Sequence, residues 1–129
     1  MLNIQQVHHV AILTDNYALS KHFYTEILGF TIIAETYREA RQSYKLDLAV
    51  NGQYQIELFS FTEYRERASF PEAKGLRHLA FAVKDVEASA LYLKSQNVNV
   101  EEVRTDELTG KKFVFFWDPN GQPLELYEV

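Results

Sequence analysis

The chain has 129 residues, of which 47% are hydrophobic, so its composition is that of one globular domain with its own core. It contains no cysteine, which excludes disulfides, thiolate metal sites and cysteine catalysis, and its net charge of −5 without a basic tract argues against nucleic acid or an anionic membrane as partner. The first residues lack the basic start of a signal peptide and no apolar run is long enough to span a bilayer, so we expect a cytoplasmic protein.

The first half of the chain predicts one strand, one helix and three further strands, over residues 7–14, 17–28, 30–37, 43–50 and 53–61. Asp15 and Asn16 can cap the helix, and Gly29 follows it where a left-handed residue is expected. Asn51-Gly52 predicts a tight turn between the last two strands, because both residues tolerate positive φ. The predicted order of this half is therefore β-α-β-β-β.

The same order recurs in the second half, over residues 76–83, 86–97, 97–103, 111–118 and 122–129. Asp85 can cap the helix, whose inward residues are predicted to be Val86, Ala90, Leu91 and Leu93. Residues 61–75 show no clear period and contain Pro71, Gly75 and many charges, so we expect them to link the halves. We predict a single domain over residues 1–129, made of module 1 (about 5–60), the linker 61–75 and module 2 (about 76–129).

Each half also carries a histidine in its first strand and a glutamate in its last. His9 opens the apolar run HHVAIL and Glu57 follows in YQIELF, whereas His78 opens RHLAFAV and Glu125 follows in PLELYEV at nearly the same separation. Because successive side chains of a strand point to opposite faces, these residues are predicted on the face opposite the bulky apolar ones. Two imidazoles and two carboxylates form a suitable ligand set for a divalent metal ion.

Five segments carry a resemblance to a known family: HHVAIL, SKHFYTEILGF, QIELFSF, GLRHLAFAV and FVFFWDPNGQPLELYEV. They resemble the vicinal oxygen chelate superfamily, which includes glyoxalase I, methylmalonyl-CoA epimerase, fosfomycin-resistance proteins and extradiol dioxygenases. The chain is similar in particular to its small bacterial members, described only as glyoxalase family proteins. The resemblance covers nearly the whole chain and implies an α+β fold, in which two βαβββ modules form a curled mixed sheet around a metal cavity.

The resemblance implies that one divalent metal ion is held by His9, Glu57, His78 and Glu125. His9 rather than His8 matches, because it directly precedes the apolar pair of its strand. The nitrogen and oxygen donors suit Ni, Co, Zn, Mn or Fe and do not choose among them. The implied function is that of a lyase or isomerase acting on a small oxygenated substrate through a metal-stabilised enediolate, with Glu125 as the catalytic base and Glu57 as its counterpart.

Two alternatives stay open. An Fe-dependent dioxygenase would need two histidines and one carboxylate, although the carboxylate at Glu57 favours the four-ligand subgroup. A non-catalytic binding or resistance protein is the other alternative, although such members of the superfamily lack the metal ligands. Within the enzymes, Ser60 stands where bacterial glyoxalase I has an asparagine that helps to hold glutathione, and the run VAILT lacks its arginine. These differences argue against a glutathione substrate.

The remaining candidates concern the substrate and the assembly. Arg38, Arg41 and Lys45 surround a predicted turn between strands, where they form either a solvated rim or a clamp for a carboxylate or phosphate of the substrate. The aromatic residues of the last two strands are expected mainly in the core, with one of them free to line the cavity: Phe113, Phe115, Trp117 and Tyr127. The expected partners are a small-molecule substrate and a second copy of the chain in a homodimer, with the metal site within one chain or shared between two.

Overall fold

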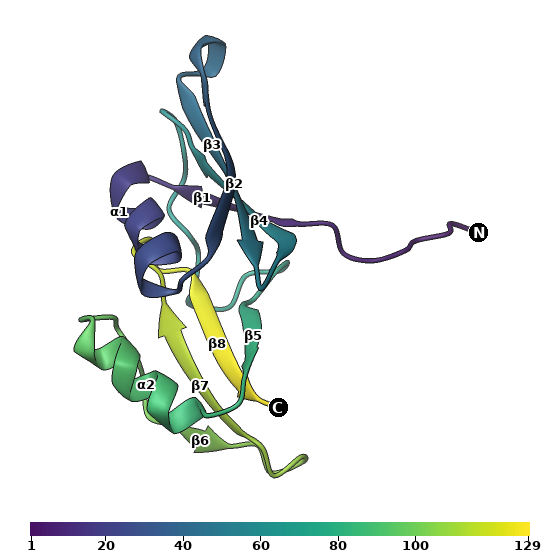
Figure 1. The fold of residues 1–129 in the computed structure, drawn as a ribbon, viewed down its shortest axis with the longest axis vertical. Helices are drawn as coiled ribbons and strands as arrows, with labels where there is room; N and C mark the ends of the chain where they lie inside the picture. Colours follow the sequence, from purple (N-terminus) through teal and green to yellow (C-terminus); the bar gives the residue numbers. More distant parts are fainter. The chain divides into compact units, whose positions relative to one another are not determined.

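The computed structural model describes residues 1–129, which divide into two compact units, Met1–Arg65 and Glu66–Val129. Each unit contains a strand, a helix and three further strands, and its four strands form one mixed sheet (Figure 1). The predicted α+β class and the repeated β-α-β-β-β order are confirmed. The predicted bounds of the modules and of the linker stay a prediction.

The first unit consists of β1 (Val10–Thr14), α1 (Tyr17–His22), the π-helical turn η1 (Phe23–Ile27), β2 (Thr31–Arg38), the 3₁₀ turn η2 (Glu39–Arg41), β3 (Ser43–Val50) and β4 (Gln53–Ser60). Its strands follow the order β1-β4-β3-β2, with β1 parallel to β4 and the other pairs antiparallel. Strand β4 is therefore an inner strand, whose residues have neighbours on both sides.

Local sequence signals explain where these elements begin and end. The Asn16 side chain accepts a hydrogen bond from the Leu19 N–H at 3.2 Å and so caps α1. Gly29 has a φ of +79° directly after the helical segment, and Asn51 and Gly52 have φ values of +50° and +82° in the turn between β3 and β4. The predicted cap, stop and turn are confirmed. The predicted helix continues from α1 through η1, so its second part has the wider π-helical turn.

The core of the first unit follows from the alternation of side chains along β3 and β4. Leu46 pairs with Leu58 and Leu48 pairs with Ile56, and all four side chains are buried. The hydroxyls of Thr14 and Ser20, 2.6 Å apart and buried, join β1 to α1. Residues between the core positions of β3 and β4 face the opposite side of the sheet, where the candidate site lies.

The second unit consists of β5 (Leu79–Val83), α2 (Val86–Ser95), β6 (Arg104–Thr105), β7 (Lys112–Trp117) and β8 (Pro123–Glu128). Its strand order is β5-β8-β7-β6, with β5 parallel to β8 and the other pairs antiparallel. Strand β8 thus has the same inner place that β4 has in the first unit.

Helix α2 begins where it was predicted to begin, but one of its residues predicted to face the core does not. The Asp85 carboxylate accepts a hydrogen bond from the Ala88 N–H at 2.9 Å. Val86, Ala90 and Leu93 are buried, but Leu91 is 68% exposed, so its predicted inward position is wrong. Successive helical residues are about 100° apart around the axis, which turns Leu91 away from the stripe to which Ala90 belongs.

The strand predicted over residues 97–103 is also corrected. This stretch forms only an isolated bridge between Val100 and Phe116, and the pairing of β6 begins at Arg104. Asn97, with a φ of +61°, ends the turn after α2 in a conformation that no strand contains. The apolar residues of the predicted strand alternate as expected, but the chain meets β7 at only one point before β6.

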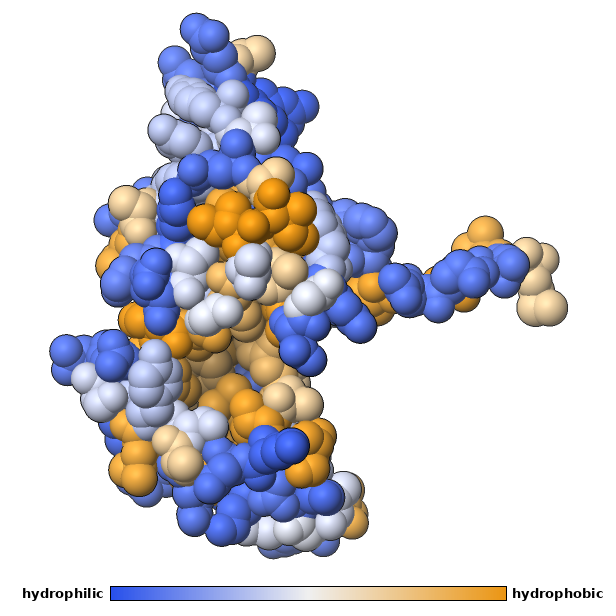
Figure 2. All heavy atoms as spheres, in the orientation of Figure 1, coloured by the Kyte–Doolittle hydropathy of each residue, from blue (hydrophilic) through white to orange (hydrophobic).

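Residues 1–9 precede β1 without forming a helix or strand, and all are exposed. The strand predicted to start at residue 7 therefore starts at Val10. This segment carries four exposed apolar side chains: Met1, Leu2, Ile4 and Val7. In Figure 2 the segment shows orange and pale spheres among blue ones. Neither helix of the chain has the length and apolar character that crossing a membrane requires.

Candidate functional site

The first half of the candidate site is centred on Glu57 in β4. Ala11 of β1 and Asp47 of β3 are its neighbours across the sheet, and Glu57 is only 7% exposed. The His9 imidazole, at the residue just before β1, forms an ion pair with Glu57 through Nε2 and Oε2. The small alanine beside Glu57 leaves room for this imidazole to reach the buried carboxylate.

Lys45 forms an ion pair with the other carboxylate oxygen of Glu57. Its Nζ lies 3.0 Å from Glu57 Oε1 and 3.5 Å from Asp47 Oδ1, and the hydrogen bond to Glu57 raises the pKa of Lys45. The Tyr54 hydroxyl donates to Asp47 Oδ1 at 2.6 Å. Burial is the main cause that raises the pKa of Tyr54, and this hydrogen bond is the second. Both oxygens of Glu57 therefore have a partner, and the carboxylate is held in one orientation.

The second half of the candidate site is centred on Glu125 in β8. Ala80 of β5 and Phe115 of β7 are its neighbours, and Glu125 is 9% exposed. His78, at the residue just before β5, places Nε2 2.9 Å from Glu125 Oε2 and packs edge-on against Phe115 at 4.9 Å between ring centroids. Glu125 Oε1 has no hydrogen-bond or ion-pair partner, so this carboxylate is less constrained than Glu57.

The two halves share their ligands and differ in their surroundings. Each glutamate lies opposite an alanine of the parallel strand, but on the antiparallel side Glu57 meets Asp47 where Glu125 meets Phe115. Two positions further along, on the same face of each sheet, Lys45 opposite Phe59 corresponds to Phe113 opposite Tyr127. The repeat therefore keeps a histidine and a glutamate in both units, and surrounds one pair with charges and the other with aromatic rings.

The donor chemistry of these pairs fits a divalent metal ion. In both, Nε2 of the imidazole and Oε2 of the carboxylate face each other, as ligands of one ion do. Burial favours a cation that neutralises each carboxylate. No group of three or more His, Cys, Asp or Glu side chains suited to an ion occurs in the structure, so each unit by itself offers only two ligands.

The three predicted substrate cations occupy different places. Lys45 is bound to Glu57, as described. Arg38 lies on the same face of the sheet, where its guanidinium donates to Ser43 Oγ at 2.8 Å and stacks 4.8 Å from the Phe59 ring centroid, while its Nε is buried without a partner. Arg41 lies in η2 and lines a separate open pocket with Phe61. A role of these residues in substrate binding stays a prediction.

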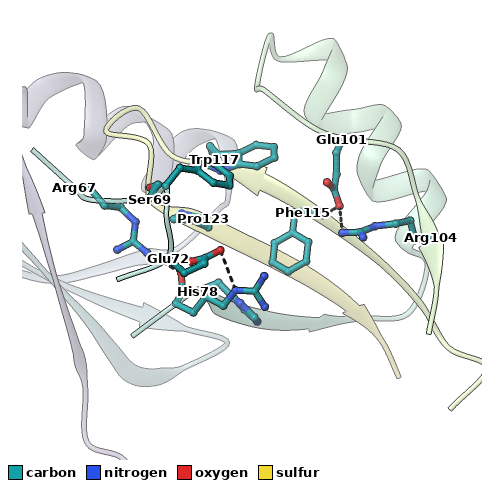
Figure 3. Close-up of a pocket in the computed structure, with 11 residues that line it drawn as sticks. Arg67, Ser69, Glu72, His78, Glu101, Arg104, Phe115, Trp117 and Pro123 are labelled. Carbon is teal, nitrogen blue, oxygen red and sulfur yellow. Dashed lines mark hydrogen bonds and ion pairs between the residues drawn. The ribbon is translucent and has the colours of Figure 1, made fainter. Parts of the chain in front are cut away.

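Two of the four aromatic residues expected mainly in the core, Phe115 and Trp117, line a cavity of about 230 Å³ in the second unit, beside His78 (Figure 3). Its floor is formed by Phe115, Trp117 and Pro123, which share the sheet face of Glu125. Its rim carries three arginines and two glutamates, which come from the segment after residue 66 and from the chain between α2 and β6: Arg67, Glu72, Arg77, Glu101 and Arg104. The alternation of β7 was the one available signal, because it separates Phe115 and Trp117 from the buried Phe116.

Comparisons with known proteins agree with this architecture. The model of the Glyoxalase/Bleomycin resistance protein/Dioxygenase superfamily matches residues 6–126. The uncharacterized protein YaeR of Escherichia coli is 60% identical over 128 residues, which cover 99% of both chains. The crystal structure of SMU.1112c has a TM-score of 0.91 at 47% identity, and covers 98% of this chain and 100% of that one.

Two more distant relatives have names that state an activity. The 2-epi-5-epi-valiolone epimerase of an Actinomyces species is 30% identical over 144 residues, covering 95% of this chain and 79% of the epimerase. The metallothiol transferase FosB of Staphylococcus saprophyticus is 30% identical over 131 residues, covering 96% of this chain and 77% of FosB. An epimerase and a metallothiol transferase are thus similar to this chain over most of its length.

Proposed function

Because this chain belongs to the Glyoxalase/Bleomycin resistance protein/Dioxygenase superfamily, we propose that it is a metal-dependent enzyme, a lyase or isomerase that acts on a small oxygenated substrate. Its proposed metal ligands are His9, Glu57, His78 and Glu125. The bound ion, one of Ni, Co, Zn, Mn or Fe, would supply a Lewis acid that polarises a substrate oxygen. An epimerase and a metallothiol transferase among the relatives support this class of function.

One observation carries the proposal: each unit presents an imidazole against a buried carboxylate at the same position of its sheet. A single pair has the ordinary explanation of a structural ion pair. Two pairs with the same atoms facing each other, both beside an alanine of a parallel strand, are better explained by a shared chemical role. Two such pairs supply the two nitrogens and two oxygens that a catalytic ion uses while leaving room for substrate.

Glu125 is the proposed base, because its carboxylate retains a free oxygen. Glu57 is held by His9 at one oxygen and by Lys45 at the other, whereas Glu125 Oε1 has no partner. A group that takes a proton from carbon must present an unoccupied lone pair close to that carbon. The asymmetry of the two halves thus gives Glu57 an anchoring role and Glu125 the proton transfer.

Metal analysis of the purified protein tests the ligand set. We expect about one ion per chain in the wild type, and a loss of the ion in His9→Ala and equally in His78→Ala, because the four ligands serve one ion. His22→Ala, which changes a histidine of α1 outside both pairs, is the matched control and should keep the ion. Two ions per chain, with each histidine variant losing only one, would contradict a shared site.

The proposal includes a homodimer, which the exposed edge of the first sheet supports. Strand β2 is at the edge, and its apolar residues Ile32, Ile33 and Tyr37 are 42%, 50% and 49% exposed. Proteins ordinarily protect such an edge, and a second copy of the chain is one means of doing so. Light scattering should give about twice the chain mass of 15.0 kDa, and a monomer mass throughout the concentration range would contradict the dimer.

A further inference from the structure

Apart from His78, the side chains that line the cavity have no role in the proposed metal site. The floor of the cavity is aromatic and apolar, and its rim carries five charged side chains (Figure 3). Phe115 touches both His78 and the guanidinium of Arg104, whose centre lies 5.7 Å from the Phe115 ring centroid. A molecule in this cavity would therefore lie next to one of the proposed metal ligands.

The charges of the rim do not cancel. Arg104 is paired with Glu101 at 2.6 Å, and Arg77 is paired more loosely with Glu72 at 3.4 Å. Arg67 has no carboxylate partner. Three arginines against two glutamates leave one positive charge in excess, in a chain whose net charge is −5. The excess charge attracts an anion, and its place in the rim is Arg67.

Arg67 is oriented by neutral acceptors and keeps donors for a ligand. Its Nη2 donates to the carbonyl oxygens of Arg77 at 2.8 Å and of Leu76 at 3.4 Å, and its Nη1 donates to Gln122 Oε1 at 3.3 Å. A guanidinium has five N–H groups, so three are used and two remain. The backbone carbonyls fix the group in place without neutralising it, so its charge and remaining donors are available to a carboxylate or phosphate, which a guanidinium binds well.

We propose that this cavity binds a small oxyanion, a carboxylate or a phosphate, and that Arg67 recognises it. The carbon part of the ligand lies over Phe115 and Trp117. That this anion is part of the enzyme's substrate rests on the proposed function, whereas anion binding by the cavity does not. The substrate class is then a short oxygenated compound with one anionic end.

Trp117 gives a direct measurement, because it is the only tryptophan of the chain and lines the cavity. Its fluorescence is titrated, at constant ionic strength, with inorganic phosphate, with propanoate and with neutral propane-1,2-diol. The protein is first treated with a chelator, so that an anion cannot bind through a metal. We expect the fluorescence to change saturably with phosphate or propanoate and not with the diol, and the tighter of the two anions identifies the class.

Arg67→Gln should weaken this binding about 10-fold or more, since a charge-assisted hydrogen bond is lost. Arg67→Lys, which keeps the charge and the fold but loses the planar fork, should bind at an intermediate strength. Arg65→Gln removes the same charge from an exposed position two residues earlier, outside the cavity, and should bind as the wild type does. Circular dichroism establishes that each variant is folded.

Three results would overturn the proposal: no saturable change with either anion, equal weakening by Arg67→Gln and Arg65→Gln, or binding of the diol as tight as that of the anions. The metal analysis separates this failure from that of the proposed function. A chain that binds no ion but binds phosphate through Arg67 keeps the anion site and loses the enzyme. If the protein binds its ion but no anion, the proposed metal site stands and the proposed anion binding by the cavity is wrong.

Discussion

Glu125→Gln is expected to lower the activity about 100-fold to 10,000-fold per bound metal ion, the range typical of losing a general base. The amide keeps the size of the carboxylate and retains an oxygen donor, but it cannot take a proton from carbon. The measurement is the exchange of a carbon-bound proton next to a carbonyl with deuterium from solvent, followed by NMR with a panel of small hydroxyketones and aldehyde–thiol adducts. Metal content is determined on the same samples, so that proton transfer is separated from metal loss.

Glu57→Gln is the matched variant, because it makes the same change at the equivalent position of the other unit. Lys45 and His9 each bind one oxygen of Glu57 and hold this carboxylate in one orientation, whereas Glu125 keeps one oxygen without a partner. We therefore expect this variant to lose metal, while the ions that remain turn over substrate at a rate within about 10-fold of the wild type. An equal loss per bound ion in the two variants would show that the roles of the two glutamates are not distinct, and undiminished exchange in Glu125→Gln would exclude it as the base.

Local signals in the sequence were sufficient for most of the fold. The Asn16 and Asp85 caps, the Asn51-Gly52 turn and the positive φ of Gly29 depend on neighbours only a few residues away, and all four are confirmed. The prediction of a strand over residues 97–103 was wrong, because alternation of apolar residues does not show whether another strand lies alongside. Pairing is a tertiary property, and here the chain meets β7 only at Val100 before β6 begins.

The candidate site shows the same division. The four proposed ligands could be predicted from the sequence on two grounds: the repeated pattern of a histidine and a glutamate in each half, and the resemblance to the family. The bond from Lys45 to Glu57 could not be predicted, because it depends on the register that places Asp47 opposite Glu57 and brings Lys45 alongside. Arg67 could not be predicted either. It lies in a segment without periodicity, where only the folded path brings its guanidinium to the carbonyls of Leu76 and Arg77.

Phe116→Ala is expected to lower the free energy of unfolding by about 3–5 kcal/mol, the usual result of deleting a fully buried aromatic side chain. Phe116 is 0% exposed, pairs with Leu124 and forms the bridge to Val100, so its removal leaves a cavity in the buried core of the second unit. Urea unfolding followed by circular dichroism measures the change. The expected loss of stability concerns the second unit, in which all of these contacts lie.

Phe115→Ala is the control, because it deletes the same side chain one residue earlier on the opposite, half-exposed face. We expect it to cost much less, since the solvent and the cavity beside His78 already border that ring, and to alter anion binding instead. Leu91→Ala should change stability by no more than about 0.5 kcal/mol, because the leucine predicted to face inward is exposed. Similar losses for Phe115 and Phe116 would mean that both faces of β7 are packed core. The aromatic floor would then have no room for a ligand.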